Sequence, residues 1–283
     1  MPNKAFLEIT NVCNLSCSFC HGTKREPKFI STEEFRIAAE RLRPFADYLY
    51  FHLMGEPLLH PDLSEFLKIS ENLGFRVILT TNGTLLDKCA DTLLSSPALH
   101  KVSISLHSYE ANSVCESLES YLDSCFDFCR KASQRGIISV LRLWNCGGLD
   151  SLNDEIIKKM HQSFDENDNS KWQEIYSGYK IRDKLFLEWG NLFEWPDIDA
   201  EDIGGNHSCY GLRDQIGVLC DGTVVPCCLD ADGSINLGNI FTTPLSYILD
   251  SDRAKNLRQS FIEKNVKEKL CRKCGYAKMK NYK

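Results

Sequence analysis

Apolar runs of strand length alternate with amphipathic stretches of helical length between residues 5 and 189. Such alternation is typical of repeated strand–helix units, which build a parallel sheet. The pattern predicts six strands, with a helix after each of the first five: Ala5–Thr10, Tyr48–Met54, Phe75–Thr81, Lys101–His107, Ile137–Leu143 and Lys184–Trp189. The first part of the chain is therefore expected to have an α/β fold.

The two faces of the predicted strands differ in polarity, because successive side chains of a strand point to opposite faces. One face is apolar and includes Leu7, Leu53 and Leu187. The other face is rich in polar side chains: Glu8, Thr10, His52, Thr80, Asn82, Ser103, Ser105, His107, Arg142 and Glu188. Burying so many polar groups requires a polar ligand or water. Since parallel sheets are normally covered on both faces, we expect a curved, partial (β/α)6 barrel of the TIM type with a polar lumen.

The pattern changes beyond Gly190, where an acidic, irregular stretch begins. A hairpin is predicted from Gln215–Leu219 and Thr223–Pro226, and a helix from Ser246–Lys264. We therefore expect a barrel domain over residues 1–190 and a small α+β domain over residues 191–283. So few elements predict a domain that depends on a metal for its stability.

Composition makes two classes of partner unfavourable. The 283 residues carry a net charge of -6, without the basic excess typical of nucleic-acid-binding proteins. The start lacks the features of a signal peptide, and no apolar run reaches the roughly 18 residues of a membrane span. We therefore expect a cytoplasmic protein with no nucleic-acid partner and no membrane partner.

Cysteine is unusually frequent, with 14 residues in the chain. A reducing cytoplasm keeps thiols from forming a disulfide framework, so metal or cluster ligation is the leading explanation. Nine cysteines gather near the two ends of the chain: Cys13, Cys17, Cys20, Cys209, Cys220, Cys227, Cys228, Cys271 and Cys274. The other five are expected to be small buried apolar groups: Cys89, Cys115, Cys125, Cys129 and Cys146.

The first three cysteines have the spacing C-x3-C-x2-C directly after the first predicted strand. Three thiolates on a four-iron cluster leave one iron without a protein ligand, and a bidentate small molecule can chelate it. Zinc, with His21 as a fourth ligand, is an alternative. The loop follows the carboxyl end of a predicted barrel strand, which is where barrel active sites lie.

This loop, with Phe19 just before the third cysteine, resembles the defining loop of the radical S-adenosylmethionine (SAM) superfamily. The resemblance implies that Cys13, Cys17 and Cys20 hold a [4Fe–4S] cluster whose open iron binds the amino and carboxylate groups of SAM. It also implies that the reduced cluster cleaves SAM to methionine and a 5′-deoxyadenosyl radical. That radical abstracts hydrogen from a substrate.

Further matches to the family follow the next predicted strands. Gly55-Glu56-Pro57 resembles the segment that holds the SAM amino group, and His107 stands where many relatives have aspartate. Each signal alone is more often a turn or a salt bridge, but their order at successive strand ends supports the resemblance. It implies a set of SAM-binding residues: Gly55, Glu56, Asn82, Ser105 and Arg142.

The cysteines near the end form a second set. Seventeen residues separate Cys209 from Cys227, and Cys271 and Cys274 follow as a C-x2-C pair. Together with the segment 221–227 and Gly238-Asn239-Ile240, they resemble the SPASM and twitch extensions of radical SAM enzymes. The resemblance implies one auxiliary [4Fe–4S] cluster on Cys209, Cys227, Cys271 and Cys274. Structural zinc remains an alternative for four cysteines.

Catalytic residues are not assigned by any of these motifs. In a strand, Cys228 would point away from its neighbour Cys227, so it is interpreted either as a buried thiol or as a hydrogen-atom donor like those of radical SAM epimerases. The role of Cys220 stays open. The candidates for catalysis are Glu8, His52, Glu188 and Cys228.

The resemblance leaves the substrate open, since related enzymes act on small molecules and on peptides. We expect hydrogen abstraction followed by oxidation or another radical modification. One alternative is a peptide maturase of the SPASM type, although four residues before the first strand are too few for a built-in leader-binding domain. Another is a noncatalytic zinc or iron–sulfur binding module, which has no need of a polar lumen.

Residues 264–283 carry eight Lys or Arg and one acidic residue, Glu268. A solvated tail is the simplest interpretation. The alternative is a docking surface for an acidic reductant of the flavodoxin or ferredoxin type, because charge complementarity speeds encounter.

Overall fold

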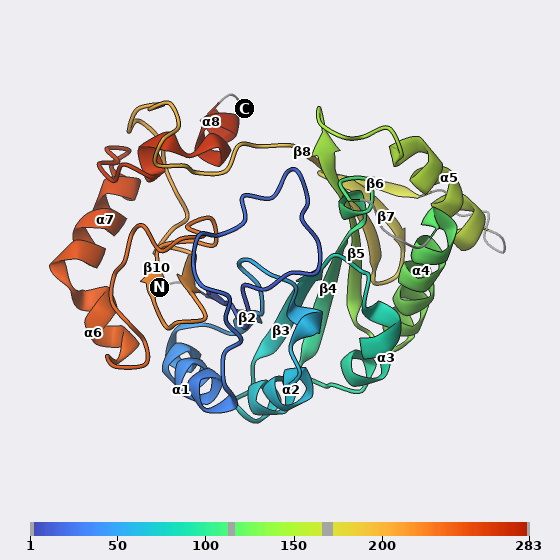
Figure 1. The fold of residues 1–283 in the computed structure, drawn as a ribbon, viewed down its shortest axis with the longest axis horizontal. Coiled ribbons are helices and arrows are strands. Elements are labelled where there is room, and N and C mark those ends of the chain that lie inside the picture. Colours follow the sequence, from blue (N-terminus) through green and yellow to red (C-terminus); the bar gives the residue numbers. More distant parts are fainter. Residues whose placement is uncertain (1–2, 113–116, 166–171, 282–283) are drawn as a thin grey trace.

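The computed structural model describes residues 3–112, 117–165 and 172–281. Ten strands form one curved sheet with the order β10-β9-β1-β2-β3-β4-β5-β8-β7-β6 (Figure 1). Its central strands are parallel and follow the chain order: β1 (Lys4–Leu7), β2 (Tyr48–Tyr50), β3 (Arg76–Thr81), β4 (Leu99–Ser105), β5 (Ile138–Cys146) and β8 (Leu185–Asn191). The predicted partial barrel is confirmed.

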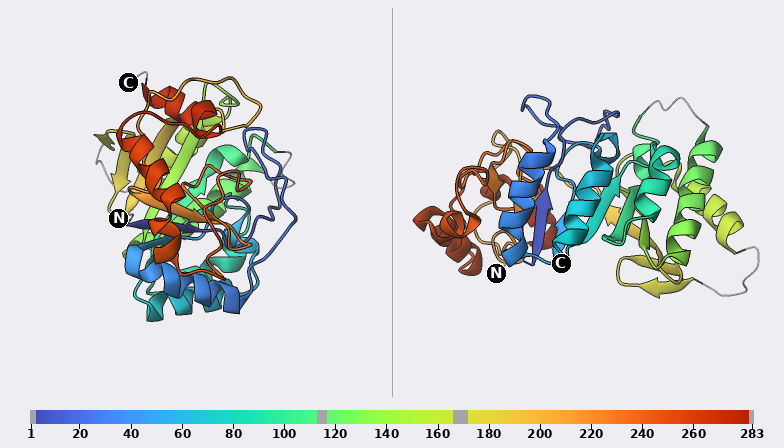
Figure 2. Two further views of the ribbon diagram at one scale, coloured as in Figure 1. Left: turned by 90° about the vertical axis from the view of Figure 1, so that its left-hand side faces the viewer. Right: turned by 90° about the horizontal axis from the view of Figure 1, so that it is seen from below.

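The helices that follow the parallel strands cover the outer face of the sheet (Figures 1 and 2). They are α1 (Thr32–Leu42), α2 (Leu63–Asn72), α3 (Leu86–Leu94), α4 (Leu118–Gln134) and α5 (Asn153–Phe164). The start of α1 is fixed by a capping box, in which Ser31 accepts from the Glu34 N–H and Glu34 accepts from the Ser31 N–H. None of the described helices combines the length and the apolar character needed to cross a membrane.

The main hydrophobic core lies between the sheet and these helices. Cys125 and Cys129 of α4 are buried in it, and Cys89 packs against it, as expected of apolar thiols. Cys115 lies outside the described residues. No disulfide joins the described cysteines.

Leu53 lies on the other side of the sheet from the position that its sequence pattern predicts. It packs with Phe6, Leu219 and Val225 in a second, smaller core rather than under the helices. The reason is that β2 ends at Tyr50, so the strict alternation of a strand does not extend to residue 53.

Beyond α5 the sheet continues with an antiparallel hairpin, β6 (Gln173–Ile175) and β7 (Gly178–Arg182), which the sequence pattern does not predict. Its strands are short, β6 is mostly exposed, and the two buried residues of β7, Gly178 and Ile181, are three positions apart. They therefore lack the alternation of apolar and polar residues that identifies a half-buried strand.

Residues beyond 190 extend the same sheet at its opposite end. The predicted hairpin is present as β9 (Gln215–Val218) and β10 (Val224–Val225), and β9 pairs in parallel with β1. The predicted single helix is wrong: Ser251 is extended and caps a second helix, so the segment forms α6 (Leu245–Asp250) and α7 (Asp252–Ile262). A last helix, α8, spans Gly275–Asn281. The division near residue 190 stays a proposal, since one sheet includes strands from both sides of it.

Gly55 and Gly136 form a matched pair for testing how tightly the end of β2 packs. Both have left-handed backbones, with φ of +73° and +75°. A Cβ on Gly55 would lie 2.4 Å from the Thr10 carbonyl oxygen, whereas one on Gly136 would have no neighbour within 4 Å. Gly136→Ala should therefore lower the free energy of unfolding by about 1–2 kcal/mol, and Gly55→Ala by about 3 kcal/mol or more.

Denaturant unfolding of the anaerobically purified variants measures this difference. Equal losses of stability for the two variants would contradict the close packing of Gly55 against the chain that leads to Cys13.

Candidate active site

The first cysteine motif forms a loop between β1 and α1. Cys13, Cys17 and Cys20 line a cavity of about 330 Å³ together with Gly55 and Trp195. Burial raises the pKa of the Cys17 thiol to about 11. Because a thiolate is disfavoured there without a cation, the loop suits a metal cluster that supplies the positive charge.

Amide groups point at the sulfur atoms of this loop. Asn112 Nδ2 lies 3.0 Å from Cys17 Sγ, and Asn82 Nδ2 lies 3.9 Å from Cys13 Sγ. Asn112 Oδ1 also accepts from the Ser16 N–H at 2.9 Å. N–H donors around sulfur stabilise the thiolate form that binds iron.

Glu56 is buried behind the cavity. Its Oε1 accepts from the Leu58 N–H at 3.0 Å, and its Oε2 accepts from the Asn82 N–H at 2.7 Å. Burial raises the pKa of its carboxyl group to about 7. Leu53, Met54 and Gly55 line the cavity in front of it. Glu56 therefore links the segment that follows β2 to Asn82, the residue that follows β3.

Ser105 and His107 lie at the end of β4, next to β5. Ser105 pairs with Arg142 in the sheet register, and His107 Nδ1 lies 3.1 Å from the Arg142 carbonyl oxygen. Phe19 of the cysteine loop packs on the His107 ring, with 4.7 Å between centroids. The loop therefore closes over the polar lumen at this point.

Arg142, Lys101 and Glu188 lie together on the lumen face. Glu188 Oε2 is 3.4 Å from Arg142 Nε, and Glu188 Oε1 is 3.8 Å from Lys101 Nζ. The Arg142 guanidinium also stacks over the Trp144 ring at 4.4 Å from its centroid. One carboxylate faces two cations here, so this group of side chains has an excess positive charge.

His52 is linked to Arg142 through the Thr80 hydroxyl. Arg142 Nη1 donates to Thr80 Oγ1 at 3.3 Å, and Thr80 Oγ1 lies 3.1 Å from His52 Nε2. A hydroxyl group has one proton and two lone pairs, so Thr80 can accept from Arg142 and either donate to His52 Nε2 or accept from it. Desolvation lowers the His52 pKa to about 3, which keeps the ring neutral in either tautomer.

Two buried nitrogen atoms of the lumen have no hydrogen-bond partner within the described part of the chain. They are His52 Nδ1 and Arg142 Nε, the latter despite its proximity to Glu188. A buried polar atom without a partner is unfavourable by about 1–3 kcal/mol. Such atoms indicate a place where a polar ligand binds.

Glu8, a candidate for catalysis from the sequence, is fully buried in a junction. It pairs with Arg25 at 2.7 Å and accepts from the Met54 N–H at 3.2 Å and the Cys220 N–H at 3.0 Å. These donors occupy both carboxylate oxygens. Cys220, whose role the sequence leaves open, is buried in the same junction.

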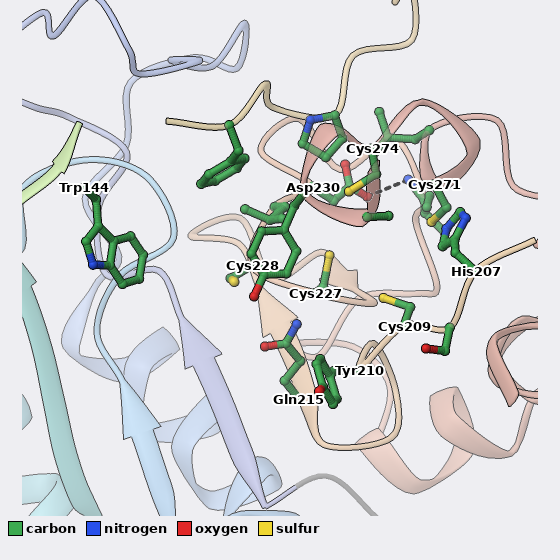
Figure 3. A pocket seen from close by; sticks show the side chains of 18 residues that line it. Trp144, His207, Cys209, Tyr210, Gln215, Cys227, Cys228, Asp230, Cys271 and Cys274 are labelled. Carbon is green, nitrogen blue, oxygen red and sulfur yellow. Dashed lines mark hydrogen bonds between the residues drawn. The ribbon is translucent and has the colours of Figure 1, made fainter. Parts of the chain in front are cut away.

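The four cysteines of the second set line one cavity of about 240 Å³ (Figure 3). Cys209 precedes β9, Cys227 follows β10, and Cys271 and Cys274 flank a short 3-10 turn. No three Cys, His, Asp or Glu side chains of the described ranges converge as the ligands of a single metal ion. A cubane does not require such convergence, because its cysteines bind four separate irons.

Cys228 lines the same cavity but lies on the Trp144 side of Cys227 (Figure 3). It packs against the small core that contains Phe6 and Leu53. Cys227 and Cys228 follow the end of β10 at Val225, so the rule that neighbouring strand residues point to opposite faces does not apply to them. Burial raises the pKa of its thiol to about 12, so Cys228 is protonated in the protein without metal.

Sequence profiles identify the two parts of the chain. The profile of the radical SAM superfamily matches residues 7–164, which is more than half of the chain. The chain belongs to the radical SAM superfamily. The profile of the SPASM iron–sulfur cluster-binding domain matches residues 209–275. SAM and [4Fe–4S] clusters, one in each part, are therefore the cofactors of this radical SAM protein.

Curated relatives match part of the chain. The chain is 28% identical over 138 residues to Fe-coproporphyrin III synthase of Methanosarcina barkeri, which covers 47% of this chain and 35% of that protein. It is 35% identical over 104 residues to the probable GTP 3′,8-cyclase of Saccharolobus islandicus, covering 36% and 33%. The matches thus span about a third of these relatives.

Solved structures share the fold over nearly the whole chain. BtrN in complex with AdoMet and 2-DOIA has a TM-score of 0.62 at 19% identity, covering 97% of this chain and 93% of that one. SuiB of Streptococcus suis bound to S-adenosylmethionine has a TM-score of 0.62 at 14% identity, covering 91% and 68%. At these identities the likeness concerns the fold alone.

Three residues of the site have no place among the sequence candidates. Trp144 lies two positions after Arg142 on the same strand, so period-two alternation predicts its face but not its contact with the second cavity. Asn112 follows a turn and has no distinguishing pattern. Arg25 lies in an irregular loop, where the sequence does not indicate that it pairs with Glu8.

Iron analysis tests the assignment of the two cysteine sets. Anaerobically purified protein should contain about eight irons and eight sulfides per chain, and the variant with Cys13, Cys17 and Cys20 all changed to Ala should lose about half. Cys89→Ala is the control, because Cys89 lies outside both cavities. A single cluster together with stoichiometric zinc would refute the assignment of the second set.

Proposed function

We propose that this radical SAM protein abstracts hydrogen from a polar small molecule or peptide in the barrel lumen and oxidises or otherwise modifies it. The observation that carries this proposal is the pair of buried lumen nitrogen atoms without a hydrogen-bond partner, His52 Nδ1 and Arg142 Nε. The lumen residues also contact both cysteine sites: Phe19 of the first loop contacts His107, and Arg142 stacks on Trp144, which lines the second cavity.

The residues that would hold the cofactors lie around this lumen. Cys13, Cys17 and Cys20 would ligate the first cluster, and Cys209, Cys227, Cys271 and Cys274 the second. When bound, these groups and SAM supply a 5′-deoxyadenosyl radical and a one-electron carrier. Gly55, Ser105 and Arg142 would contact SAM, whereas Glu56 and Asn82 would position the loop and the strand ends that surround it.

The two lumen nitrogen atoms restrict the chemistry of the substrate. Arg142 Nε–H requires an acceptor atom, and His52 Nδ1 requires an acceptor or a donor according to the tautomer of its ring, so a hydroxyl group of the substrate, which can both accept and donate, would complete their hydrogen bonds. The excess positive charge of Lys101 and Arg142 over Glu188 favours an anionic or oxygen-rich group. Glu188 is the candidate for proton transfer in this region, and Cys228 is the candidate for donating a hydrogen atom.

A peptide substrate is the second candidate. A groove of about 620 Å³ adjoins the second cavity, and Trp144, Phe193 and Tyr276 line both of them. Tyr176, at the tip of the β6–β7 hairpin, is almost fully exposed beside this groove. Another SuiB structure of this fold contains its precursor peptide SuiA, with a TM-score of 0.58 at 15% identity.

The external reductant would be a flavodoxin or ferredoxin in the cytoplasm. Lys264, Lys267 and Lys269 are exposed just before Cys271. A cationic surface beside a cluster ligand favours encounter with an acidic electron carrier.

Reductive cleavage of SAM tests the proposed activity. With dithionite or flavodoxin, the cluster-loaded protein should form 5′-deoxyadenosine and methionine slowly even without substrate. The variant with Cys13, Cys17 and Cys20 changed to Ala should form none. Liquid chromatography with mass detection measures both products. If protein with full iron content neither binds SAM nor forms deoxyadenosine, the enzyme assignment fails and a noncatalytic iron–sulfur module is favoured.

Variants of the second site test its role in the overall reaction. With a compound that accelerates deoxyadenosine release as substrate, Cys227→Ala and Cys271→Ala should still form deoxyadenosine but yield at least about tenfold less product, since a substrate radical must lose an electron to become a carbonyl or an unsaturated bond. Circular dichroism and the iron content of the first site are the controls. Product formation at the normal rate by the folded variants would rule out an electron-accepting role.

A further inference from the structure

The segment after the first cysteine loop is hydrogen-bonded to the segment after Cys227 and Cys228. Thr23 Oγ1 donates to Asp232 Oδ1 at 2.7 Å, and the Lys24 N–H donates to the same oxygen at 2.8 Å. Thr23 is three residues from Cys20, and Asp232 is four residues from Cys228. These contacts therefore join the two cysteine sites through two short stretches of chain.

Arg25 makes a second connection between the same segments. Its Nε donates to the Ala231 carbonyl oxygen at 2.9 Å, and its Nη2 donates to Glu8 Oε1 at 2.7 Å. Glu8 Oε2 in turn accepts from the Cys220 N–H in the β9–β10 hairpin. Because this ion pair is buried, loss of either partner would leave an uncompensated charge.

Both ends of this connection are fixed at a cavity. Asp230 lines the second cavity, the one that contains Cys209, Cys227, Cys271 and Cys274. It accepts from the Ser234 and Ile235 N–H groups, each at 2.8 Å. At the other end, His21 Nε2 lies 3.8 Å from Asp232 Oδ2 and stacks on Trp195, which lines the first cavity. A displacement of segment 230–232 would therefore reach the residues next to Cys20.

We propose that segment 230–232 positions the first cysteine loop, so that each cluster is retained less well when this contact is lost. Asp232 and Thr23 act as positioning residues, because neither is a cluster ligand. The inference goes beyond the proposed function, since it holds for any substrate and any reaction of the assembled enzyme.

Thr23→Val tests this proposal, because valine keeps the shape of threonine and removes its hydroxyl. Asp232→Ala removes the same contact from the other side. Asp221→Ala is the matched control: Asp221 is exposed and accepts from the Thr223 N–H within the hairpin turn, away from the first loop. Circular dichroism verifies that each variant is folded.

Iron loss from the reduced holoenzyme to a ferrous chelator is the measurement, and electron paramagnetic resonance follows the two clusters separately. Thr23→Val and Asp232→Ala should each accelerate loss of iron from both sites by at least about fivefold, the factor expected for one lost hydrogen bond, because each variant removes more than one. Asp221→Ala should lose iron at the wild-type rate. Loss at the wild-type rate from either site, or equal acceleration by Asp221→Ala, would overturn the proposal.

A double-mutant comparison separates positioning from general destabilisation. In the variant that lacks Cys13, Cys17 and Cys20, the first loop holds no cluster, so Asp232→Ala should accelerate loss of the auxiliary cluster by a smaller factor than in the wild type. An unchanged factor would show that Asp232 acts only on its own domain, and the proposal would fail. Because iron loss is measured without SAM, a failure of the proposed enzymatic activity would not affect this outcome.

Discussion

The buried Glu8 carboxylate is the interaction on which the arrangement of the two cysteine sites depends. A charge without solvent must be compensated by partners, and Glu8 obtains them from three places: Arg25 after the first cysteine loop, Met54 after β2, and Cys220 in the β9–β10 hairpin. Each partner belongs to a segment that shapes a cavity. The need to satisfy one carboxylate therefore fixes the first loop, the strand-end groups and the auxiliary region relative to one another.

This constraint also explains why one sheet includes strands from both parts of the chain. The pairing of β9 with β1 places Val218 beside Leu7, the last residue of β1, which directly precedes Glu8. The Glu8 N–H donates to the Val218 carbonyl oxygen at 2.9 Å. Glu8 therefore binds the β9–β10 hairpin through both its backbone N–H and its side-chain carboxylate. Residues beyond 190 are therefore joined to the barrel by strand pairing as well as by the connecting chain, and they extend one edge of its sheet.

The sequence predicts the features that depend on local pattern. The parallel strands follow from alternation, and the cysteine cavities agree with the spacing of the two motifs. It does not predict contacts between segments far apart in the chain. Glu8 was a candidate for catalysis because its strand position indicates the lumen, yet its partner Arg25 lies 17 residues away in a loop without periodicity. The position of Leu53 was wrong for a related reason, since the end of β2 is not marked in its hydrophobic pattern.

The charge distribution of the lumen distinguishes two kinds of polar group. His52 is neutral, because desolvation holds its pKa near 3. Its Nε2 is hydrogen-bonded to Thr80, and the hydrogen-bonding capacity of its unpartnered Nδ1 does not vary with pH in the neutral range. Arg142 combines a charge with stacking on Trp144, at the boundary with the second cavity. A ligand that hydrogen-bonds with both nitrogen atoms would lie beside Trp144, so the groups that bind it would also set its distance from the cysteines of the second cavity.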